Sequence, residues 1–479
     1  MIRNFTISIL LLISITGAAQ EKAFRSFLAD SCMINGAVSF LIKTADSGKT
    51  VFSYDPEKSL IPASIQKLLT SSAALELLGP SYTFKTEIGY SGILNRRNGT
   101  LTGDIIIKGG GDPSLGSPRF DSIYHDFEGQ WVNEIRSAGI KKVKGRVITD
   151  DSYYDYLPVP AKWLWEDAGN YYGAGAYGLS VFDNSYEIHF RTSPDSLRQV
   201  ITGVVPKECS FEFANWLVAA GTSDEGYIFA APYSTNGWLA GSLPVSPDDY
   251  TLKASISDPP LIMAKILDNR LKAADFRISG IPSTTRLLQS GPDSGFIKLS
   301  ETRSPKLSDI LTALNHESVN LYAEHLVKEL GKVFHGSGST EAGVSVVRNF
   351  LRNNGIGEEG MFIEDGSGLS PLDAVNASSM TSLLLFMKNH AKYPGDFFAS
   401  LPEAGKEGTL KNHFKDPVFE GRMNAKSGSM TRVRSYAGYL KALSGKEMAF
   451  CIIVNNFRGS SATVIRHIEE ILAETIQDN

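Results

Sequence analysis

The stretch Ser64-Ile65-Gln66-Lys67 places a hydroxyl and an amine three residues apart in a run, residues 63–75, that has the composition of a helix. Residues three apart on a helix share one face and can touch. A serine hydroxyl becomes a good nucleophile when a neighbouring amine accepts its proton, and a lysine can do so when burial or nearby positive charge lowers its pKa. On its own the motif is weak, because an ordinary helix start with an exposed lysine has the same residues.

Two further short motifs occur downstream. Ser318-Val319-Asn320 opens an apolar run, and Lys426-Ser427-Gly428 precedes a strand-like segment at residues 433–440. In this order, S-x-x-K, S-x-N and K-[ST]-G match the motif set of β-lactamases and penicillin-binding proteins. Val319 replaces the usual Asp of the second motif, and Ser427 keeps the hydroxyl of the usual Thr in the third. Together the three motifs favour acyl transfer through Ser64.

The chain has 479 residues, of which 42% are hydrophobic, and this length suits about two or three domains. Its formal net charge of −5 argues against nucleic acid as the main partner. Residues 1–19 combine Arg3, an apolar stretch and Gly17-Ala18-Ala19, as in a secretory signal cleaved before Gln20. No later run reaches the roughly 18 apolar residues that a membrane span needs. We therefore expect export to the periplasm, with at most peripheral membrane contact.

The three cysteines, Cys32, Cys209 and Cys451, form no disulfide framework. Cys451 lies in an apolar, strand-like run and is interpreted as a small core residue. A bridge between Cys32 and Cys209 stays open at this stage.

The order of the segments predicts an inserted region. Two strand-like runs precede the Ser64 helix, short β-like runs fill residues 82–297, and helical periodicity returns thereafter. About 250 residues separate Lys67 from Ser318, although the chemistry requires them within hydrogen-bond reach. The sequence therefore predicts a discontinuous catalytic domain, with one or two β-rich domains inserted into it. The predicted catalytic domain comprises residues 20–81 and 298–479, and the predicted insertion comprises residues 82–297.

Three other motifs have simpler structural interpretations. The G-x-G-x-x-G spacing at residues 173–178 is followed by a strand-like segment rather than a helix. Gly109-Gly110-Gly111-Asp112-Pro113 lacks the ending of a phosphate loop and is interpreted as a turn. His316-Glu317 lacks the second histidine of the H-E-x-x-H zinc motif. The sequence therefore indicates no nucleotide, no metal and no other cofactor.

With the three motifs in place, the chain resembles the class C low-molecular-mass penicillin-binding proteins, the D-alanyl-D-alanine carboxypeptidase/endopeptidase family. The resemblance runs from about residue 24 to about residue 475 and includes residues 105–113, 145–150 and 365–370. It implies an α+β fold, in which a transpeptidase-like five-stranded antiparallel sheet is flanked by helices and carries a β-rich insertion.

The resemblance also implies catalytic roles for five residues. Ser64 would attack the carbonyl of a D-Ala-D-Ala peptide bond, and Lys67 would accept its proton. Ser318 would relay a proton to the leaving amine, and Asn320 would complete the hydrogen-bond network. Lys426 would raise the positive potential around Ser318 and help to hold the terminal carboxylate of the substrate. Water would then release the acyl-enzyme.

Substrate-binding roles are implied for further positions. Ser427 would donate to the terminal carboxylate of the substrate, beside Gly428, and the backbone N–H groups of Ser429 and the nucleophile would form an oxyanion hole. Asp150 occupies the place of a family aspartate that meets the amino end of a diaminopimelate side chain. Pro371 stands where related enzymes often carry an arginine for the acidic end of that side chain.

We therefore expect an exported serine DD-peptidase that cleaves D-Ala-D-Ala ends of peptidoglycan stem peptides and is inhibited by β-lactams. Whether it also cuts D-Ala-diaminopimelate cross-links stays open. Two alternatives remain at this stage. A β-lactamase would need an efficient deacylating base, and no Glu-x-x-Leu-Asn element appears. A non-catalytic wall-binding protein would need none of the five catalytic residues.

Overall fold

A five-stranded antiparallel sheet joins the two ends of the chain. The computed structural model describes residues 18–479, apart from residues 211, 247 and 290–294. The N-terminal strand β1 pairs along its whole length with the C-terminal strand β19, from Ala37 opposite Asn455 to Thr44 opposite Met448. In the order β17-β18-β19-β1-β2, the strands are β17 (Met423–Met430), β18 (Val433–Lys441), β19 (Glu447–Asn455), β1 (Ala37–Thr44) and β2 (Thr50–Tyr54).

The sheet is the middle layer of three, because its central strand is buried on both faces. Ala449, Cys451 and Ile453 of β19 belong to one hydrophobic cluster, whereas the alternating residues Phe450 and Ile452 belong to another. Successive side chains of a strand point to opposite faces, so the continuous apolar run of β19 serves two cores at once.

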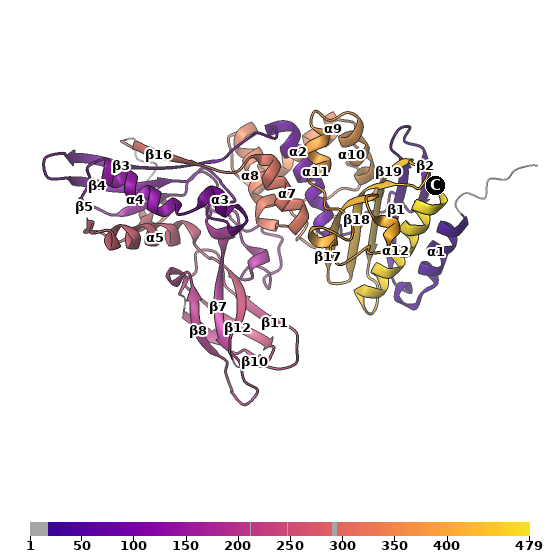
Figure 1. Cartoon of the computed structure of the whole chain (residues 1–479), viewed down its shortest axis with the longest axis horizontal. Coiled ribbons are helices and arrows are strands. Elements are labelled where there is room, and N and C mark those ends of the chain that lie inside the picture. Colours follow the sequence, from indigo (N-terminus) through magenta and orange to yellow (C-terminus); the bar gives the residue numbers. More distant parts are fainter. Residues whose placement is uncertain (1–17, 211, 247, 290–294) are drawn as a thin grey trace, which may run out of the picture.

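Helices from both halves of the sequence cover the two faces of this sheet (Figure 1). On one face lie α1 (Ala18–Ala29) and α12 (Ser461–Asp478), and on the other lie α2 (Lys67–Leu78), α8 (Asn320–His335) and α10 (Ala377–Asn389). The remaining helices of this part are α7 (Leu307–Glu317), α9 (Thr340–Asn353) and α11 (Pro394–Ala399). The predicted α+β fold, with a five-stranded antiparallel sheet flanked by helices, is confirmed.

The intervening residues form further sheets, and the largest has seven strands. Its strands are β3 (Lys85–Asn95), β4 (Thr100–Lys108), β5 (Lys142–Lys144), β6 (Val147–Asp150), β14 (Arg277–Ile278), β15 (Ser283–Thr284) and β16 (Ile297–Arg303). Apolar residues of α4 (Phe127–Ser137) and α5 (Pro259–Ala273) share a hydrophobic cluster with this sheet. The short helices α3 (Asp121–Tyr124) and α6 (Thr285–Leu288) complete the region.

Two smaller sheets project away from the long axis of the molecule (Figure 1). One has three strands, β7 (Ser185–Arg191), β8 (Val200–Val205) and β13 (Tyr250–Ser255). The other has four strands, β9 (Glu212–Asn215), β10 (Val218–Ala219), β11 (Glu225–Phe229) and β12 (Asn236–Leu243). The proposed domain limits stay a prediction, and β16 spans the predicted boundary at residues 297/298.

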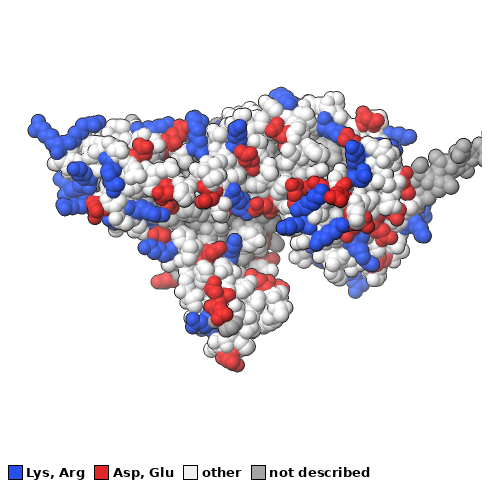
Figure 2. Space-filling model, in the orientation of Figure 1, with Lys and Arg blue, Asp and Glu red and all other residues white. Residues whose placement is uncertain are grey.

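The surface carries both signs of charge. Figure 2 shows acidic and basic side chains interspersed over the part that contains the five-stranded sheet, with Lys and Arg more frequent at the end that carries β3, β4 and β5. Among the described residues, no helix has the length and apolar character that a membrane crossing requires. The predicted signal at residues 1–19 lies outside the described residues except for Ala18 and Ala19, which begin α1.

The three cysteines are free and buried, and each lies in a different hydrophobic cluster. Cys32 packs beside α1 and α12, Cys209 lies in the cluster of the inserted strands, and Cys451 lies in the strand β19. The Cys32–Cys209 bridge that the sequence left open is therefore absent, and the interpretation of Cys451 as a core residue is confirmed.

Removing the buried ring of Phe27 should show that α1 is an integral part of the core. Phe27 of α1 is fully buried, and its ring centroid lies 5.3 Å from that of His467 on α12. We expect Phe27→Ala to lower the free energy of unfolding by about 3–5 kcal/mol, because it leaves a cavity between these helices. Urea denaturation followed by circular dichroism measures the change.

The matched control is Ile34→Ala, whose side chain is 67% exposed. Its unfolding midpoint should stay close to that of the unmodified protein. Equal small shifts for the two variants would show that α1 contributes little to the core.

Candidate active site

Ser64 is the one residue of its segment that reaches the surface. It lies in η2 (Ala63–Gln66), one turn of 3₁₀ helix that leads directly into α2. Ser64 is half-buried, whereas every residue from position 65 to position 76 is buried. The turn is held by the sheet, because Asn455 both accepts from the Ile61 N–H at 2.8 Å and donates to the Ile61 carbonyl at 3.0 Å. The hydroxyl of Ser64 is therefore presented from a rigid base.

Two glycines allow other segments to approach this turn closely. A Cβ atom on Gly428 of β17 would lie 2.6 Å from the Pro62 carbonyl oxygen and 3.1 Å from the Ser64 nitrogen. A Cβ atom on Gly368 would lie 2.1 Å from the Ala63 carbonyl oxygen. Real Cβ contacts are not this short, so β17 and the segment around Gly368 can reach Ser64 only because both positions are glycine.

The side chain of Lys67 lies in the centre of the site. Its Nζ is 2.9 Å from Ser64 Oγ, 2.6 Å from Asn320 Oδ1 and 2.8 Å from the carbonyl oxygen of Ser367. The amide of Asn320 is oriented by Tyr172, whose carbonyl accepts a hydrogen bond from Asn320 Nδ2 at 2.8 Å. Two of the three partners of Lys67 are carbonyl oxygens that can only accept. A neutral amine donating to both would direct its lone pair at the Ser64 hydroxyl.

Burial favours that neutral amine. Lys67 is fully buried, and loss of hydration lowers its pKa to about 7. The negative charges of Asp365, Glu324 and Asp373 act in the opposite direction, and burial outweighs them. Burial also raises the pKa of Glu324 and of Asp373, in each case with help from the charge of Asp365. The site therefore holds a proton acceptor that is available near neutral pH.

A second buried lysine lies on the neighbouring edge strand β17. Lys426 Nζ is 2.9 Å from Ser318 Oγ and donates to the Ser427 carbonyl at 2.8 Å. Burial lowers the pKa of Lys426 well below its usual value, and the charge of Lys67 lowers it further. Ser318 reaches this lysine from the turn between α7 and α8, where it adopts the left-handed conformation with φ 59°. Strain of this kind in a residue other than glycine is typical of functional turns.

The five residues predicted to be catalytic therefore form two groups: Ser64 and Asn320 contact Lys67, and Ser318 contacts Lys426. Of the predicted substrate-binding residues, Ser427 donates from Oγ to Thr409 Oγ1 at 2.7 Å, and Ser429 is exposed on β17. The other two are Gly428, which faces the Ser64 turn, and Asp150.

Asp150 is not brought to this cluster by any contact between described residues. At the end of β6, its carboxylate accepts from the N–H and the hydroxyl of Ser152, at 3.1 and 2.7 Å. One inserted carboxylate that connects to the cluster is Asp167, which is hydrogen-bonded to the Tyr172 side chain and has its pKa raised to about 6, mainly by burial. Tyr172 in turn orients Asn320, so this aspartate is linked to the site through one residue.

Residues 365–370 were part of the family resemblance, but the support that this loop gives to Lys67 was not predicted. Asp365 accepts from the N–H groups of Ser367, Gly368 and Ser370, at 3.0, 2.6 and 2.8 Å, and from the indole of Trp163 at 2.7 Å. These bonds fix the carbonyl of Ser367 where Lys67 donates to it. The Asp-Gly-Ser-Gly order of residues 365–368 is a turn signal that could have suggested such a loop.

A cavity of about 440 Å³ opens beside Ser318 and Asn320. Its walls include Tyr171 and Tyr172 of the turn η4 (Tyr171–Gly173), and Lys253 of β13. Segments from both sides of the predicted domain boundary thus line one cleft, and its volume is in the range of ligand-binding pockets.

A methyl group at position 428 should disturb the approach of β17 to the Ser64 turn. In Gly428→Ala the new Cβ would meet the Pro62 carbonyl and the Ser435 hydroxyl that donates to it at 2.5 Å. We expect a loss of about 1–3 kcal/mol in the free energy of unfolding, as for other overpacked sites. Thermal or urea unfolding measures it.

Gly357→Ala is the matched control, since nothing lies within 4 Å of a Cβ at that position. It should unfold close to the unmodified protein. If the two variants are equally stable, the contact between β17 and η2 is looser than the structure indicates.

Comparisons with known proteins agree with this geometry. Residues 20–477 match the family described as "D-Ala-D-Ala carboxypeptidase 3 (S13) family". The D-alanyl-D-alanine carboxypeptidase of Actinomadura sp. (strain R39) is 29% identical over 448 residues, which are 90% of this chain and 80% of that protein. The D-alanyl-D-alanine carboxypeptidase DacB of Haemophilus influenzae is 23% identical over 429 residues, which are 88% of this chain and 85% of that protein.

Solved structures share the fold. The crystal structure of penicillin binding protein 4 (dacB) from Haemophilus influenzae superposes with a TM-score of 0.77 at 21% identity, covering 92% of this chain and 95% of the other. A second structure of that protein, complexed with a novel β-lactam, gives a TM-score of 0.75 at 20% identity, covering 95% and 97%. The family resemblance that the three motifs predicted is confirmed.

Proposed function

The chain belongs to the D-Ala-D-Ala carboxypeptidase 3 (S13) family of serine-type peptidases, and from that premise we propose that it cleaves peptidoglycan stem peptides through an acyl-enzyme on Ser64. The observation that carries the assignment is the 2.9 Å contact between Ser64 Oγ and the buried amine of Lys67. A hydroxyl beside a neutral amine is the activated nucleophile that acyl transfer needs.

In the proposed acylation step, the Ser64 hydroxyl gives its proton to Lys67 Nζ as its oxygen attacks the carbonyl carbon of the D-Ala-D-Ala bond. The resulting oxyanion accepts from the N–H groups of Ser64 and Ser429, and each such donor is worth about 3–4 kcal/mol in the transition state. The tetrahedral intermediate then collapses, the C–N bond breaks, and the acyl group stays on Ser64.

The leaving amine needs a proton, and Ser318 is placed to relay it. Ser318 Oγ lies 2.9 Å from Lys426 Nζ, so a proton that passes from Ser318 to the amine can be replaced from a lysine. No carboxylate is among the groups that shift the pKa of Lys426. The terminal carboxylate of a D-Ala-D-Ala substrate would supply that missing negative charge and accept a hydrogen bond from Ser427. Binding of a substrate with a free carboxyl end would therefore favour the charged form of Lys426.

Water then hydrolyses the acyl-enzyme, and a β-lactam would acylate Ser64 in the same way. Cleavage of D-Ala-diaminopimelate cross-links is part of the proposal as a second activity. Export to the periplasm is proposed from residues 1–19. Cleavage before Gln20 would leave an ammonium at the Gln20 nitrogen, which lies 3.1 Å from the carboxylate of Asp478, so the mature end would be paired by charge.

Labelling by a fluorescent penicillin tests the nucleophile. We expect the purified protein to carry one covalent label, located on the Ser64 peptide by mass spectrometry, and Ser64→Ala to carry none, because the proposed acylation step forms its bond to the hydroxyl that contacts Lys67. The control is Ser72→Ala, a buried serine eight residues further along, which should label normally. Labelling of Ser64→Ala at the normal rate would remove the assignment.

The same assay separates the proposed peptidase from a β-lactamase. A DD-peptidase should keep its penicilloyl label through the assay, because nothing in the motif set supplies an efficient deacylating base. Rapid release of the label with many turnovers of penicillin would favour the β-lactamase alternative.

The rate of acylation should rise with pH through a midpoint near 7. The pKa of Lys67 is lowered to about 7, and only its neutral form can accept the Ser64 proton. Below the midpoint the rate should fall by about tenfold per pH unit. Stopped-time labelling from pH 5.5 to 9, with circular dichroism to verify folding, measures the profile, and a flat profile between pH 6 and 8 would contradict the role of Lys67.

A further inference from the structure

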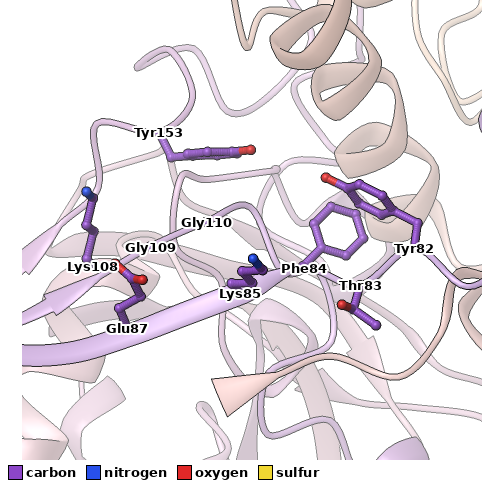
Figure 3. A pocket seen from close by; sticks show the side chains of 9 residues that line it. All are labelled: Tyr82, Thr83, Phe84, Lys85, Glu87, Lys108, Gly109, Gly110 and Tyr153. Carbon is purple, nitrogen blue, oxygen red and sulfur yellow. The ribbon is translucent and has the colours of Figure 1, made fainter. Parts of the chain in front are cut away.

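A second concave site lies away from the cavity beside Ser318 and Asn320. It is a cavity of about 360 Å³ bounded by the beginning of β3, the end of β4 and the segment around Tyr153 (Figure 3). The hydroxyls of Tyr82 and Tyr153, which form two of its walls, donate to Glu329 of α8. Glu329 is nine residues after Asn320, the first residue of that helix, or about 14 Å along its axis. The cavity is therefore separate from the reacting groups.

Two lysines place positive charge along this cavity. Lys108 of β4 is the cross-strand partner of Glu87 on β3, and Lys85 lies two residues before Glu87. Cross-strand partners, and residues two apart on one strand, lie on the same face of a sheet. Figure 3 shows Lys85, Glu87 and Lys108 together along the cavity.

The acidic residues on this face are already paired with other cations. Lys298 of β16 donates to Glu87 at 2.9 Å and to Glu301 at 2.7 Å, and Arg303 approaches Glu301 at 2.6 Å. Within the described part of the chain, no ion pair engages Lys85 or Lys108. The one carboxylate among the residues that line the cavity, Glu87, is thus already paired with Lys298, and the two lysines lie on a chain whose formal net charge is −5.

The aromatic walls are fixed before any ligand arrives. The hydroxyls of Tyr82, Tyr153 and Tyr154 all donate to the buried carboxylate of Glu329. Lys332, in the last turn of α8, lies 5.1 Å from the centroid of the Tyr153 ring. Side chains held in this way lose little conformational entropy on binding, which favours affinity.

Gly109 and Gly110 line the cavity, and Gly111 follows them in the chain. A Cβ on Gly110 would lie 2.0 Å from the Lys85 carbonyl oxygen. Gly111 has φ 73°, and a Cβ there would lie 2.4 Å from the Tyr154 hydroxyl. Glycine is therefore needed at both positions for this segment to pass close to β3 and to Tyr154.

We propose that this cavity binds the carboxylate end of a second stem peptide of the same wall polymer, while Ser64 acts on the first. The choice of ligand rests on the proposed function: D-Ala-D-Ala ends, and the ends left by their cleavage, carry a free carboxylate. Lys85 and Lys108 pair with that carboxylate by charge-assisted hydrogen bonds, and the rings of Tyr82 and Tyr153 contact its methyl groups. Binding at two sites raises the effective concentration of further chain ends at Ser64.

The experiment measures peptide binding with the Ser64 site blocked. Protein acylated with benzylpenicillin, verified by its mass gain, is titrated by calorimetry with a soluble N-acylated stem peptide that ends in a free D-alanine carboxylate. The unmodified chain should bind it, and a variant carrying Lys85→Glu and Lys108→Glu should bind at least about tenfold more weakly, because both favourable charges are reversed. The same peptide with an amide end should bind as weakly to the unmodified chain.

The matched control carries Lys142→Glu and Lys144→Glu, which reverse two exposed lysines of β5. It should bind the peptide within about twofold of the unmodified chain. Equal affinity of the Lys85/Lys108 variant and the unmodified chain, equal affinity for acid and amide ends, or no binding to the unmodified acylated chain would each overturn the proposal.

This experiment distinguishes a failure of the cavity proposal from a failure of the proposed Ser64 function. Acylation without peptide binding leaves the Ser64 mechanism intact and removes the second site. If penicillin adds no mass, the titration is made with Ser64→Ala instead. Binding that depends on Lys85 and Lys108 would then support the cavity while the acyl-enzyme function falls, and binding that is independent of both lysines would overturn the cavity as well.

Discussion

The burial of one amine is the constraint on which the rest of the site depends. Lys67 is fully buried, and its nitrogen lies between the Ser64 hydroxyl, the Asn320 amide oxygen and the Ser367 carbonyl. Each partner comes from a different segment, so the amine is correctly placed only when η2, α8 and the loop after Asp365 are all in position. The five-stranded sheet, which closes the two ends of the chain on each other, provides the base from which these segments are held.

The inserted region is part of this arrangement. The Tyr172 carbonyl orients Asn320, and the Trp163 indole donates to Asp365. Further along α8, Tyr153 and Tyr154 donate to Glu329. Helix α8 is therefore contacted by inserted residues at its beginning and in its second half. Buried polar groups are costly when unpaired, so folding of the insertion helps to complete the active site. The tyrosines of the second cavity are held by the same helix, α8.

The sequence predicted the residues whose chemistry is local and missed those whose chemistry depends on tertiary structure. Ser64 and Lys67 are one helical turn apart, and the other two motifs carry recognisable side chains, so the five proposed catalytic residues could be identified. The carbonyls of Ser367 and Tyr172 could not, because any residue has a carbonyl and only the fold aims it. The substrate-binding role of Asp150 came from the family resemblance alone and stays a prediction; its carboxylate bonds to Ser152, whereas Asp167 is linked to Asn320 through Tyr172.

The central claim, that Lys67 is a neutral base near physiological pH, can be tested by NMR titration of the protein labelled with ¹³C at lysine Cε. The signal that disappears in Lys67→Met belongs to Lys67. The account predicts that this signal titrates with a midpoint near 7, and that its midpoint depends on an intact fold. A midpoint close to the ordinary lysine value of about 10.4 would show that the amine is charged at neutral pH and would contradict the account.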